Sequence, residues 1–236
     1  MYFASTTYGG IAYFTAPLKD ASATGDAAEI TVFDTTSRSF ALSVKGRHLI
    51  VSKADSNDMR TVVEVFELSN DSLFTLVTAD QQNAAPTWSV AIPAAATDVR
   101  ANEGEISPDA FAAQNGRVSV FAPIAPGVKQ IAFSYKLPGS SFPLRVRSER
   151  AVVVFEVLVE EPQSEVKGQG FAAVDPVNLE GRNFRRFLAQ DVKADADLVV
   201  EVPAGGASGR NLYIAGLLVA VGFLMGAHQR MDRARR

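Results

Sequence analysis

The stretch that decides the fold is "TVVEVFELS", Thr61–Ser69. It is rich in β-branched and aromatic residues, which favour an extended strand over a helix. Val63 and Val65 are expected on one face of this strand. The acidic Glu64 and Glu67 are expected on the other face, which is the pattern of a half-buried strand. The stretch therefore predicts a sheet with one face on a core and one face in water.

Similar runs recur on both sides of this stretch, separated by the turn sequences "DSND", "APG" and "PGSS". Their spacing of roughly eight to twelve residues is typical of a β-sandwich rather than of alternating strands and helices. No convincing helical stripe precedes residue 205. The expected strands are "EITVF" (Glu29–Phe33), "HLIVS" (His48–Ser52), "LFTLVT" (Leu73–Thr78), "TWSVAI" (Thr87–Ile92), "RVSVFAP" (Arg117–Pro123), "KQIAFSYKL" (Lys129–Leu137), "AVVVFEVLV" (Ala151–Val159) and "DLVVEV" (Asp197–Val202).

These patterns predict an all-β fold of one or two immunoglobulin-like β-sandwich units, followed by a single C-terminal transmembrane helix. "LPGSSFP", Leu137–Pro143, is the best internal boundary, and "PAGGASG", Pro203–Gly209, has the composition of a linker. We therefore divide the chain into an N-terminal extension (1–26), a β-sandwich domain (27–138), a second, smaller β unit (139–203), a flexible linker (204–210), a transmembrane helix (211–229) and a basic cytoplasmic tail (230–236).

The expected membrane helix is the segment Asn211–Gln229, which carries no formal charge when His228 is neutral. As a helix it is roughly 28 Å long, close to the hydrocarbon thickness of a bilayer. Arg210 and Arg230 flank it and can extend toward the lipid headgroups, and Tyr213 sits where an interfacial aromatic residue belongs. The alternative is a hydrophobic helix packed on the sheet. The preceding linker, the apolar character of all faces and the arginines that follow favour the membrane.

The charges beyond the helix predict its orientation. Cytoplasmic flanks of membrane helices carry excess lysine and arginine, so the C-terminus is expected in the cytoplasm and the β body in the periplasm of a bacterial inner membrane. The first residues, "MYFASTTYGG", have no basic region and do not read as a signal peptide. Export would then need an upstream start or an unusual signal; otherwise the body is cytoplasmic. The arginines in question are Arg230, Arg233, Arg235 and Arg236.

Two surfaces are candidates for contact with other molecules. Gly222 and Gly226, and likewise Gly216 and Ala220, are spaced so that another helix can approach closely, although such residues are also common in membrane helices. "RNFRRF", which contains Arg182, Arg185 and Arg186, could meet lipid phosphates or an acidic partner. The alternative for this second segment is a strand with one solvated basic face.

Composition excludes several kinds of chemistry. The chain has no cysteine, only two histidines and a formal net charge of −3, so thiolate chemistry is excluded and nucleic-acid binding is not indicated. We expect no catalytic, cofactor or metal site: His48 has no patterned partner, His228 is interfacial, and Trp88 is core. The acidic groups at Asp55–Asp58 and Asp191–Asp197 lack the spacing of a calcium loop and read as turns.

Two short motifs match known signatures only formally. "GQGFAA", Gly168–Ala173, has dinucleotide-binding spacing, and "SEVK", Ser164–Lys167, has the spacing of a serine beside a lysine. Both signatures need a helix, and neither segment continues as one. A β turn is expected for the first, and chance explains the second.

The layout of a β body, the linker "PAGGASG", the apolar "LYIAGLLVAVGFLMG" and a basic tail resembles C-terminally anchored extracytoplasmic bacterial proteins. The whole chain resembles the cofactor-free accessory subunits of bacterial photosynthetic reaction centres with a double antenna ring. The resemblance implies a non-catalytic, membrane-anchored structural subunit that contacts reaction-centre and antenna polypeptides and holds no pigment. The alternative is an anchored β-sandwich module that binds a ligand or peptide.

Overall fold

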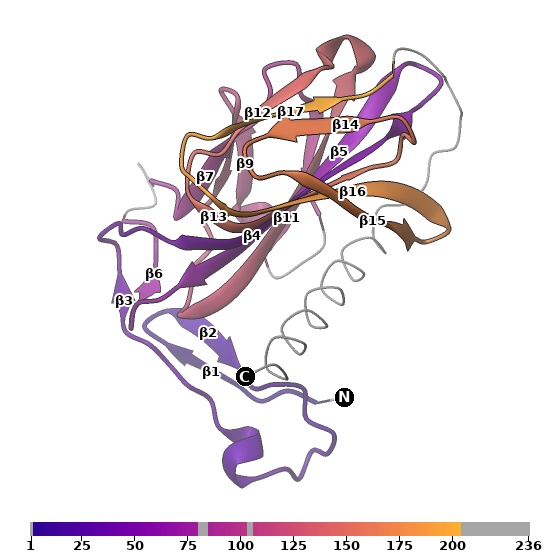
Figure 1. Cartoon of the computed structure of the whole chain (residues 1–236). Coiled ribbons are helices and arrows are strands. Elements are labelled where there is room, and N and C mark those ends of the chain that lie inside the picture. Colours follow the sequence, from indigo (N-terminus) through magenta and orange to yellow (C-terminus); the bar gives the residue numbers. More distant parts are fainter. Residues whose placement is uncertain (1, 80–84, 103–105, 204–236) are drawn as a thin grey trace.

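The computed structural model describes residues 2–79, 85–102 and 106–203. These residues form β-strands, joined by turns and by three short 3-10 segments (Figure 1). The prediction of an all-β fold is confirmed. The expected linker, membrane helix and basic tail lie outside the described residues. Within the described ranges, no helix has the length and apolar character needed to cross a membrane.

The strands are β1 (Ser5–Tyr8), β2 (Ile11–Phe14), β3 (Thr35–Thr36), β4 (Ser43–Ala54), β5 (Met59–Asn70), β6 (Thr75–Leu76), β7 (Trp88–Ala91), β8 (Thr97–Ala101), β9 (Phe111–Gln114), β10 (Arg117–Val120), β11 (Gly127–Pro138), β12 (Leu144–Arg147), β13 (Val152–Val159), β14 (Glu165–Gly168), β15 (Ala172–Leu179), β16 (Arg182–Val192) and β17 (Asp197–Glu201). The 3-10 segments are η1 (Gly25–Ala28), η2 (Pro108–Ala110) and η3 (Gly139–Ser141).

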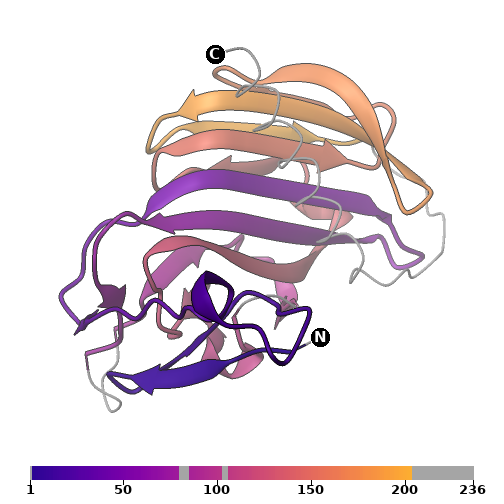
Figure 2. The same ribbon diagram turned by 90° about the horizontal axis from the view of Figure 1, so that it is seen from below.

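Seven strands form one large curved sheet in the order β15-β16-β13-β4-β5-β11-β8 (Figure 2). Its centre is the long hairpin of β4 and β5, and all neighbours in the sheet are antiparallel except β13 and β4. Asp55 closes the hairpin, because its carboxylate accepts hydrogen bonds from the backbone N–H of Asn57 and of Met59. The "DSND" segment is therefore a turn that the carboxylate of Asp55 stabilises.

Two three-stranded sheets, β7-β10-β9 and β12-β17-β14, supply the other layer of the sandwich. Apolar residues from both small sheets belong to the same buried cluster as residues of the large sheet. Trp88 of β7 packs edge-on against Phe66 of β5, with ring centroids 4.8 Å apart. Leu144 of β12 and Val200 of β17 extend the cluster at the other end. We call the large-sheet face on this cluster the inner face and its opposite the outer face.

The two expected β units share this sheet and this cluster. Strand β13 follows the "LPGSSFP" segment in sequence, yet it pairs with β4, with Val152 opposite Val44 and Leu158 opposite Ile50. The "LPGSSFP" segment itself contains the η3 turn after the end of β11. The expected boundary at residue 139 is therefore a turn between β11 and β12. Strands from both sides of this boundary belong to the large sheet.

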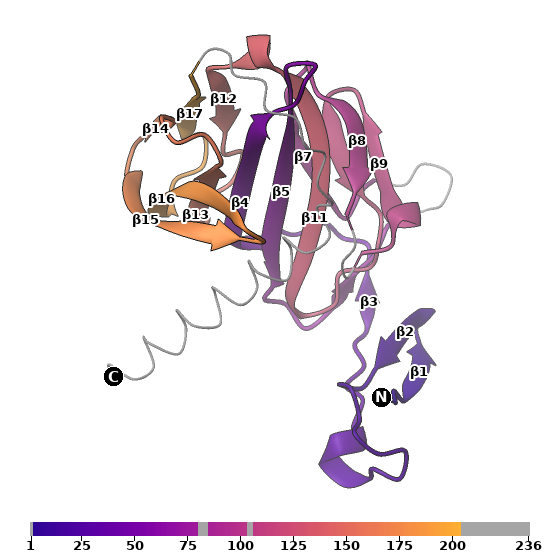
Figure 3. The ribbon, with the colours of Figure 1, turned by 90° about the vertical axis from the view of Figure 1, so that its right-hand side faces the viewer.

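The prediction of a half-buried strand at Thr61–Ser69 is wrong. Glu64 is only 1% exposed and belongs to the inner face with Phe66, while Val63 and Val65 are buried on the outer face. A second apolar cluster covers these outer positions, and residues of the β15–β16 hairpin contribute to it. Figure 3 shows this hairpin beside β4. A central strand covered on both faces does not need to alternate between apolar and polar residues.

Two further strand predictions fail near the N-terminus. Glu29–Phe33 contains no strand, and Leu73–Thr78 contains only the two residues of β6. Instead, the segment 1–26, expected as an extension, contains the β1–β2 hairpin. Strand propensity describes how well a residue fits a half-buried sheet surface, and Glu29–Phe33 pairs with no strand among the described residues.

Candidate functional site

The N-terminal residues 2–36 form an arm that projects from one end of the sandwich (Figures 1 and 3). Its centre is the β1–β2 hairpin, in which Tyr8 pairs with Ile11. Gly9 and Gly10 form the two-residue loop with φ of 57° and 79°. Both angles are in the left-handed region that such tight hairpin loops require and that glycine adopts readily.

Tyr13 attaches the arm to the body. Its ring is buried, and its hydroxyl lies 2.9 Å from the hydroxyl oxygen of Thr75 in β6. The same hydroxyl donates to the backbone carbonyl of Phe33 at 3.1 Å. Nearby, β3 at the end of the arm pairs with β6. One aromatic residue and a short strand pair therefore set the position of the hairpin.

The arm exposes large aromatic side chains, which we call the arm surface: Tyr2, Phe3, Tyr8 and Phe14. Phe3 is 58% exposed and Phe14 is 64% exposed. Tyr13 and Phe14 are adjacent in β2 and therefore point to opposite faces of the hairpin, so Phe14 lies on the face away from Tyr13. Exposed apolar patches of this kind mark contact surfaces.

The loop before β6 adds two more exposed apolar side chains at the base of the arm. Leu73 is 81% exposed, and Phe74 also faces solvent. They directly precede Thr75, which binds Tyr13. The arm itself is acidic, because it contains four carboxylates and one basic residue, Lys19, which gives a net charge of −3. The carboxylates are those of Asp20, Asp26, Glu29 and Asp34.

The three arginines predicted to contact a partner, Arg182, Arg185 and Arg186, all lie on β16 and are partly exposed. Each has a partner within the chain. Arg182 binds both carboxylate oxygens of Glu160, Arg186 binds Glu156, and Arg185 donates to the backbone carbonyl of Ser164. Their charges serve to hold β16, and contact with another molecule stays a prediction.

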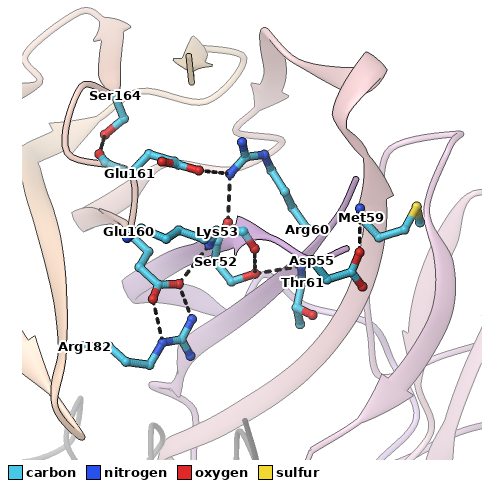
Figure 4. Close-up of polar contacts among 10 residues, drawn as sticks. All are labelled: Ser52, Lys53, Asp55, Met59, Arg60, Thr61, Glu160, Glu161, Ser164 and Arg182. Atoms are coloured by element: carbon cyan, nitrogen blue, oxygen red, sulfur yellow. Dashed lines mark hydrogen bonds and ion pairs between the residues drawn. The ribbon is translucent and has the colours of Figure 1, made fainter. Parts of the chain in front are cut away.

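Figure 4 shows how Glu160 and the adjacent Glu161 tie together elements that are distant in sequence. Glu160 accepts from the backbone N–H of Lys53 in β4 at 2.8 Å, in addition to binding Arg182. Glu161 accepts from the buried Arg60 of β5 at 2.9 Å. The segment that follows β13 is therefore fastened to the β4–β5 hairpin and to β16.

Burial raises the pKa of Glu160, but the bonds from Arg182 and Lys53 outweigh it and hold that pKa below its usual value.

A buried ion pair lies in the sandwich core between Arg47 of β4 and Glu64 of β5. Arg47 is 2% exposed and donates to Glu64 Oε2 from Nη2 at 2.7 Å and from Nε at 3.1 Å. The Tyr135 hydroxyl donates to the other oxygen at 2.9 Å. The rings of Phe66 and Phe155 each lie 4.9 Å from the guanidinium. Burial raises the pKa of Tyr135 well above its usual value, and Glu64 adds to the effect.

His48 lies on the outer face, because it follows Arg47 in the same strand. Its Nδ1 is 2.7 Å from Glu156 Oε2 of β13, and Arg186 binds the other oxygen of Glu156. Its buried Nε2 has no hydrogen-bond partner in the part of the chain that the structure describes. His48 has no patterned partner in the sequence, and the structure places it in this buried pair with Glu156.

The motifs considered from the sequence lie in turns and in contacts within the chain. Those residues contain no group of three or more histidine, aspartate or glutamate side chains positioned to hold a metal ion. Asp195, from the second acidic loop, binds Arg147 at 2.9 Å. "GQGFAA" covers the turn between β14 and β15, with Gly170 at φ 84°. Ser164 is buried and donates to the carbonyl of Glu161 at 2.8 Å.

An open cleft of about 830 Å³ lies where β4 and β13 begin and β16 ends. Phe40, Leu42, Val152 and Val192 form its apolar part. Charged side chains on its rim come from all three strands or from the residues next to them: Lys45, Arg150, Asp191 and Lys193. The sequence carries no signal for this cleft, because its lining comes from three segments that are distant in the chain.

The predicted anchor and helix-packing residues, Tyr213, Gly216, Ala220, Gly222 and Gly226, lie outside the described residues. So do the predicted headgroup contacts Arg210, Arg230, Arg233, Arg235 and Arg236. A sequence signal for the arm surface exists, because two glycines between aromatic runs in "TTYGGIAYF" are a hairpin pattern. No model of a known protein family matches the chain, and no curated protein matches its sequence.

Proposed function

We propose that the protein is a non-catalytic, membrane-anchored subunit that stabilises a larger membrane assembly through its N-terminal arm. The observation that carries this proposal is the arm surface. Phe14 exposes its ring on a hairpin whose other face is fixed to the body by Tyr13, and Phe3 exposes its ring just before that hairpin. An aromatic side chain held rigidly in water contributes little to the stability of the fold and much to association.

The charge of the arm indicates the chemistry of its partner. Four carboxylates and one lysine would be repelled by an anionic lipid surface. A protein surface with an apolar centre and a basic rim complements both the aromatic rings and the acidic residues around them. The arm is therefore proposed to contact another polypeptide and not the bilayer.

The expected anchor places this contact near a membrane. The apolar segment 211–229 would hold the β body within the short reach of residues 204–210, roughly 15 Å for a glycine-rich linker of this length. A tethered body meets a membrane-bound partner at high effective concentration, so a modest arm surface suffices for stable association. The resemblance described above identifies reaction-centre and antenna polypeptides as the partners to test first.

The test begins with gentle solubilisation of native membranes, followed by sizing of the particle that contains this chain and an absorption spectrum of that fraction. Co-migration with a large pigmented particle is the expected result. Recovery as a free monomer would refute the role as a subunit. A large colourless particle would support the role as a subunit and would show that the assembly is not photosynthetic.

Variants then separate the arm from the anchor. Phe3→Ser combined with Phe14→Ser should release the chain from the particle while leaving it in the membrane fraction. Val174→Ser, an exposed apolar position on β15, is the matched control. Gly222→Leu combined with Gly226→Leu should weaken co-purification if the helix face also docks. Full recovery of the arm variant with the particle would contradict the proposed role of the arm.

A second candidate function is an anchored module that binds a small ligand or peptide. The cleft between the ends of β4, β13 and β16 favours it, because its volume falls within the range of small-molecule sites. The same sizing experiment separates the two functions, since a binding module is expected as a free monomer.

A further inference from the structure

We propose that the cleft at the ends of β4, β13 and β16 binds an amphiphilic anion, with its acidic head at Arg150 and Lys193 and its aliphatic part along Phe40 and Leu42. The apolar part of the cleft continues the sandwich core, because Leu42, Val152 and Val192 all belong to the inner cluster. These three residues are themselves buried, and the apolar surface still open in the cleft includes that of the partly buried Phe40 and the exposed Val153. An aliphatic chain laid there would remove that surface from water.

Charge favours an anion at this place. The whole chain has a net charge of −3, yet three cations and one carboxylate line the cleft. Lys45 is already held by Asp71 at 3.5 Å. Arg150 and Lys193 form no ion pair among the described residues. Glu149, the carboxylate next to Arg150 in sequence, is bound at both oxygens by Arg117, at 2.8 and 3.0 Å.

The backbone is irregular on two of the three strands at this level. The pairing of β4 with β5 shifts register between Val44 and Gly46. On β16, Asp191 has a φ of 50°, a conformation that non-glycine residues rarely adopt. Val153 of β13 lies between these two positions and remains largely exposed. Bulges and rare backbone conformations are over-represented beside functional sites, because they open or redirect a sheet locally.

Arg150 also lines two smaller hollows, one of about 20 Å³ and one of about 140 Å³, and Trp88 lines both. Trp88 is the single tryptophan of the chain. Arg150 thus connects the cleft to the surroundings of Trp88, so a ligand that engages Arg150 is expected to shift the Trp88 emission.

The experiment measures binding of labelled octanoate by equilibrium dialysis to the full-length chain in lipid nanodiscs, with empty nanodiscs as the blank. Octan-1-ol tests the aliphatic part alone, and inorganic phosphate tests the charge alone. We expect saturable octanoate binding that shifts Trp88 emission, and dissociation constants at least tenfold higher for both octan-1-ol and phosphate. Arg150→Gln and Lys193→Gln should each weaken octanoate binding by about tenfold, the effect of one charged hydrogen bond.

Arg145→Gln is the matched control. Arg145 is an exposed arginine on β12 that does not line the cleft, so its loss should leave octanoate binding unchanged. Because both cleft substitutions are at the surface, each variant can be checked for an unaltered unfolding midpoint before binding is measured. Absence of saturable octanoate binding would overturn the proposal. Equal binding of octan-1-ol, equal binding of phosphate, or an unchanged constant in both cleft variants would overturn it as well. The test needs no partner chain, so its result is independent of the proposed assembly.

Discussion

Phe133 and Phe14 have the same side chain and opposite surroundings. Phe133, in β11, is 0% exposed and stacks against Phe66 with ring centroids 6.1 Å apart. Phe14, in β2, extends into solvent from a hairpin that projects beyond the sandwich. In the body, Phe66, Trp88 and Phe133 belong to one buried cluster, whereas in the arm Tyr13 is buried and Phe3 and Phe14 are exposed.

Charged residues differ between the two regions in the same way. In the body, Arg47 and Glu64 neutralise each other inside the core, and Glu156 and Glu160 are bound by arginines of β16. In the arm, the carboxylates are at the surface and outnumber the single lysine. The body pairs these charged groups internally. The arm bonds Asp34 to Tyr8 and Asp20 to the backbone N–H of Ser22, yet its acidic side chains and most of its aromatic rings remain exposed to another surface. Mutations can test whether this division holds.

The largest effect is expected at the buried pair. Glu64→Ala would leave the Arg47 guanidinium buried without its carboxylate and the Tyr135 hydroxyl without its acceptor. Removing one partner of such a pair costs about 3–5 kcal/mol in the free energy of unfolding. Urea denaturation followed by circular dichroism measures this loss. Replacing both partners together, Arg47→Met with Glu64→Leu, should restore much of it. A double variant no more stable than the single one would contradict this explanation.

The next effect is a dependence on pH at Glu156. Burial raises the pKa of this carboxyl, but the hydrogen bonds from His48 and Arg186 outweigh it and hold the pKa below its usual value. A carboxyl with a lowered pKa in the folded state stabilises the protein above its unfolded pKa of about 4.3. That contribution is lost as the pH falls through the folded-state value.

Glu156→Gln should therefore destabilise the protein by about 1–3 kcal/mol at neutral pH, and the difference from the wild type should shrink as the pH falls below about 4.3. Urea midpoints measured at several pH values check this. Glu165→Gln, at an exposed position on β14, provides the control. A constant difference between Glu156→Gln and the wild type across the acid range would show that the charge of Glu156 is not what stabilises the fold.

A smaller and more local effect is expected where the two regions meet. Tyr13→Phe keeps the ring but removes the hydroxyl that contacts Thr75 and Phe33. Loss of such a buried hydrogen-bonding group costs about 1 kcal/mol. Hydrogen exchange should accelerate in the arm and in β6 while β4 and β5 keep their protection. Faster exchange throughout the sandwich would show that the arm and the body unfold as one unit.

The sequence predicted the body better than the arm. Long runs such as Lys129–Leu137 and Ala151–Val159 lie within or almost match β11 and β13, because many consecutive β-branched and aromatic residues leave few alternatives. The burial of Glu64 was not predictable, since its partners Arg47 and Tyr135 lie on two other strands. Likewise, the cleft depends on Phe40, Arg150 and Lys193, which only the folded sheet brings together.

The arm was missed for a different reason. Its strands are only four residues long, and its aromatic residues are interrupted by Ser, Thr and Gly, so they do not stand out as strands in a composition-based reading. In this segment the sequence pattern that indicates a hairpin is the turn, and the strands themselves give no clear pattern. Two adjacent glycines between Tyr8 and Ile11 allow the tight loop that pairs the flanking residues.

The smallest effect on stability is expected on the arm surface. Phe14→Ala removes a ring that is mostly in solvent, so the free energy of unfolding should change by less than about 0.5 kcal/mol. Phe133→Ala, the matched substitution in the core, should cost about 3–5 kcal/mol. Urea midpoints of the two variants, measured side by side on the isolated chain, give the comparison directly. A loss above about 1 kcal/mol for Phe14→Ala would mean that its ring packs on the body, and the arm would then belong to the fold and not to a contact surface. An unchanged midpoint, together with release of the chain from its particle in native membranes, would place the role of Phe14 in association.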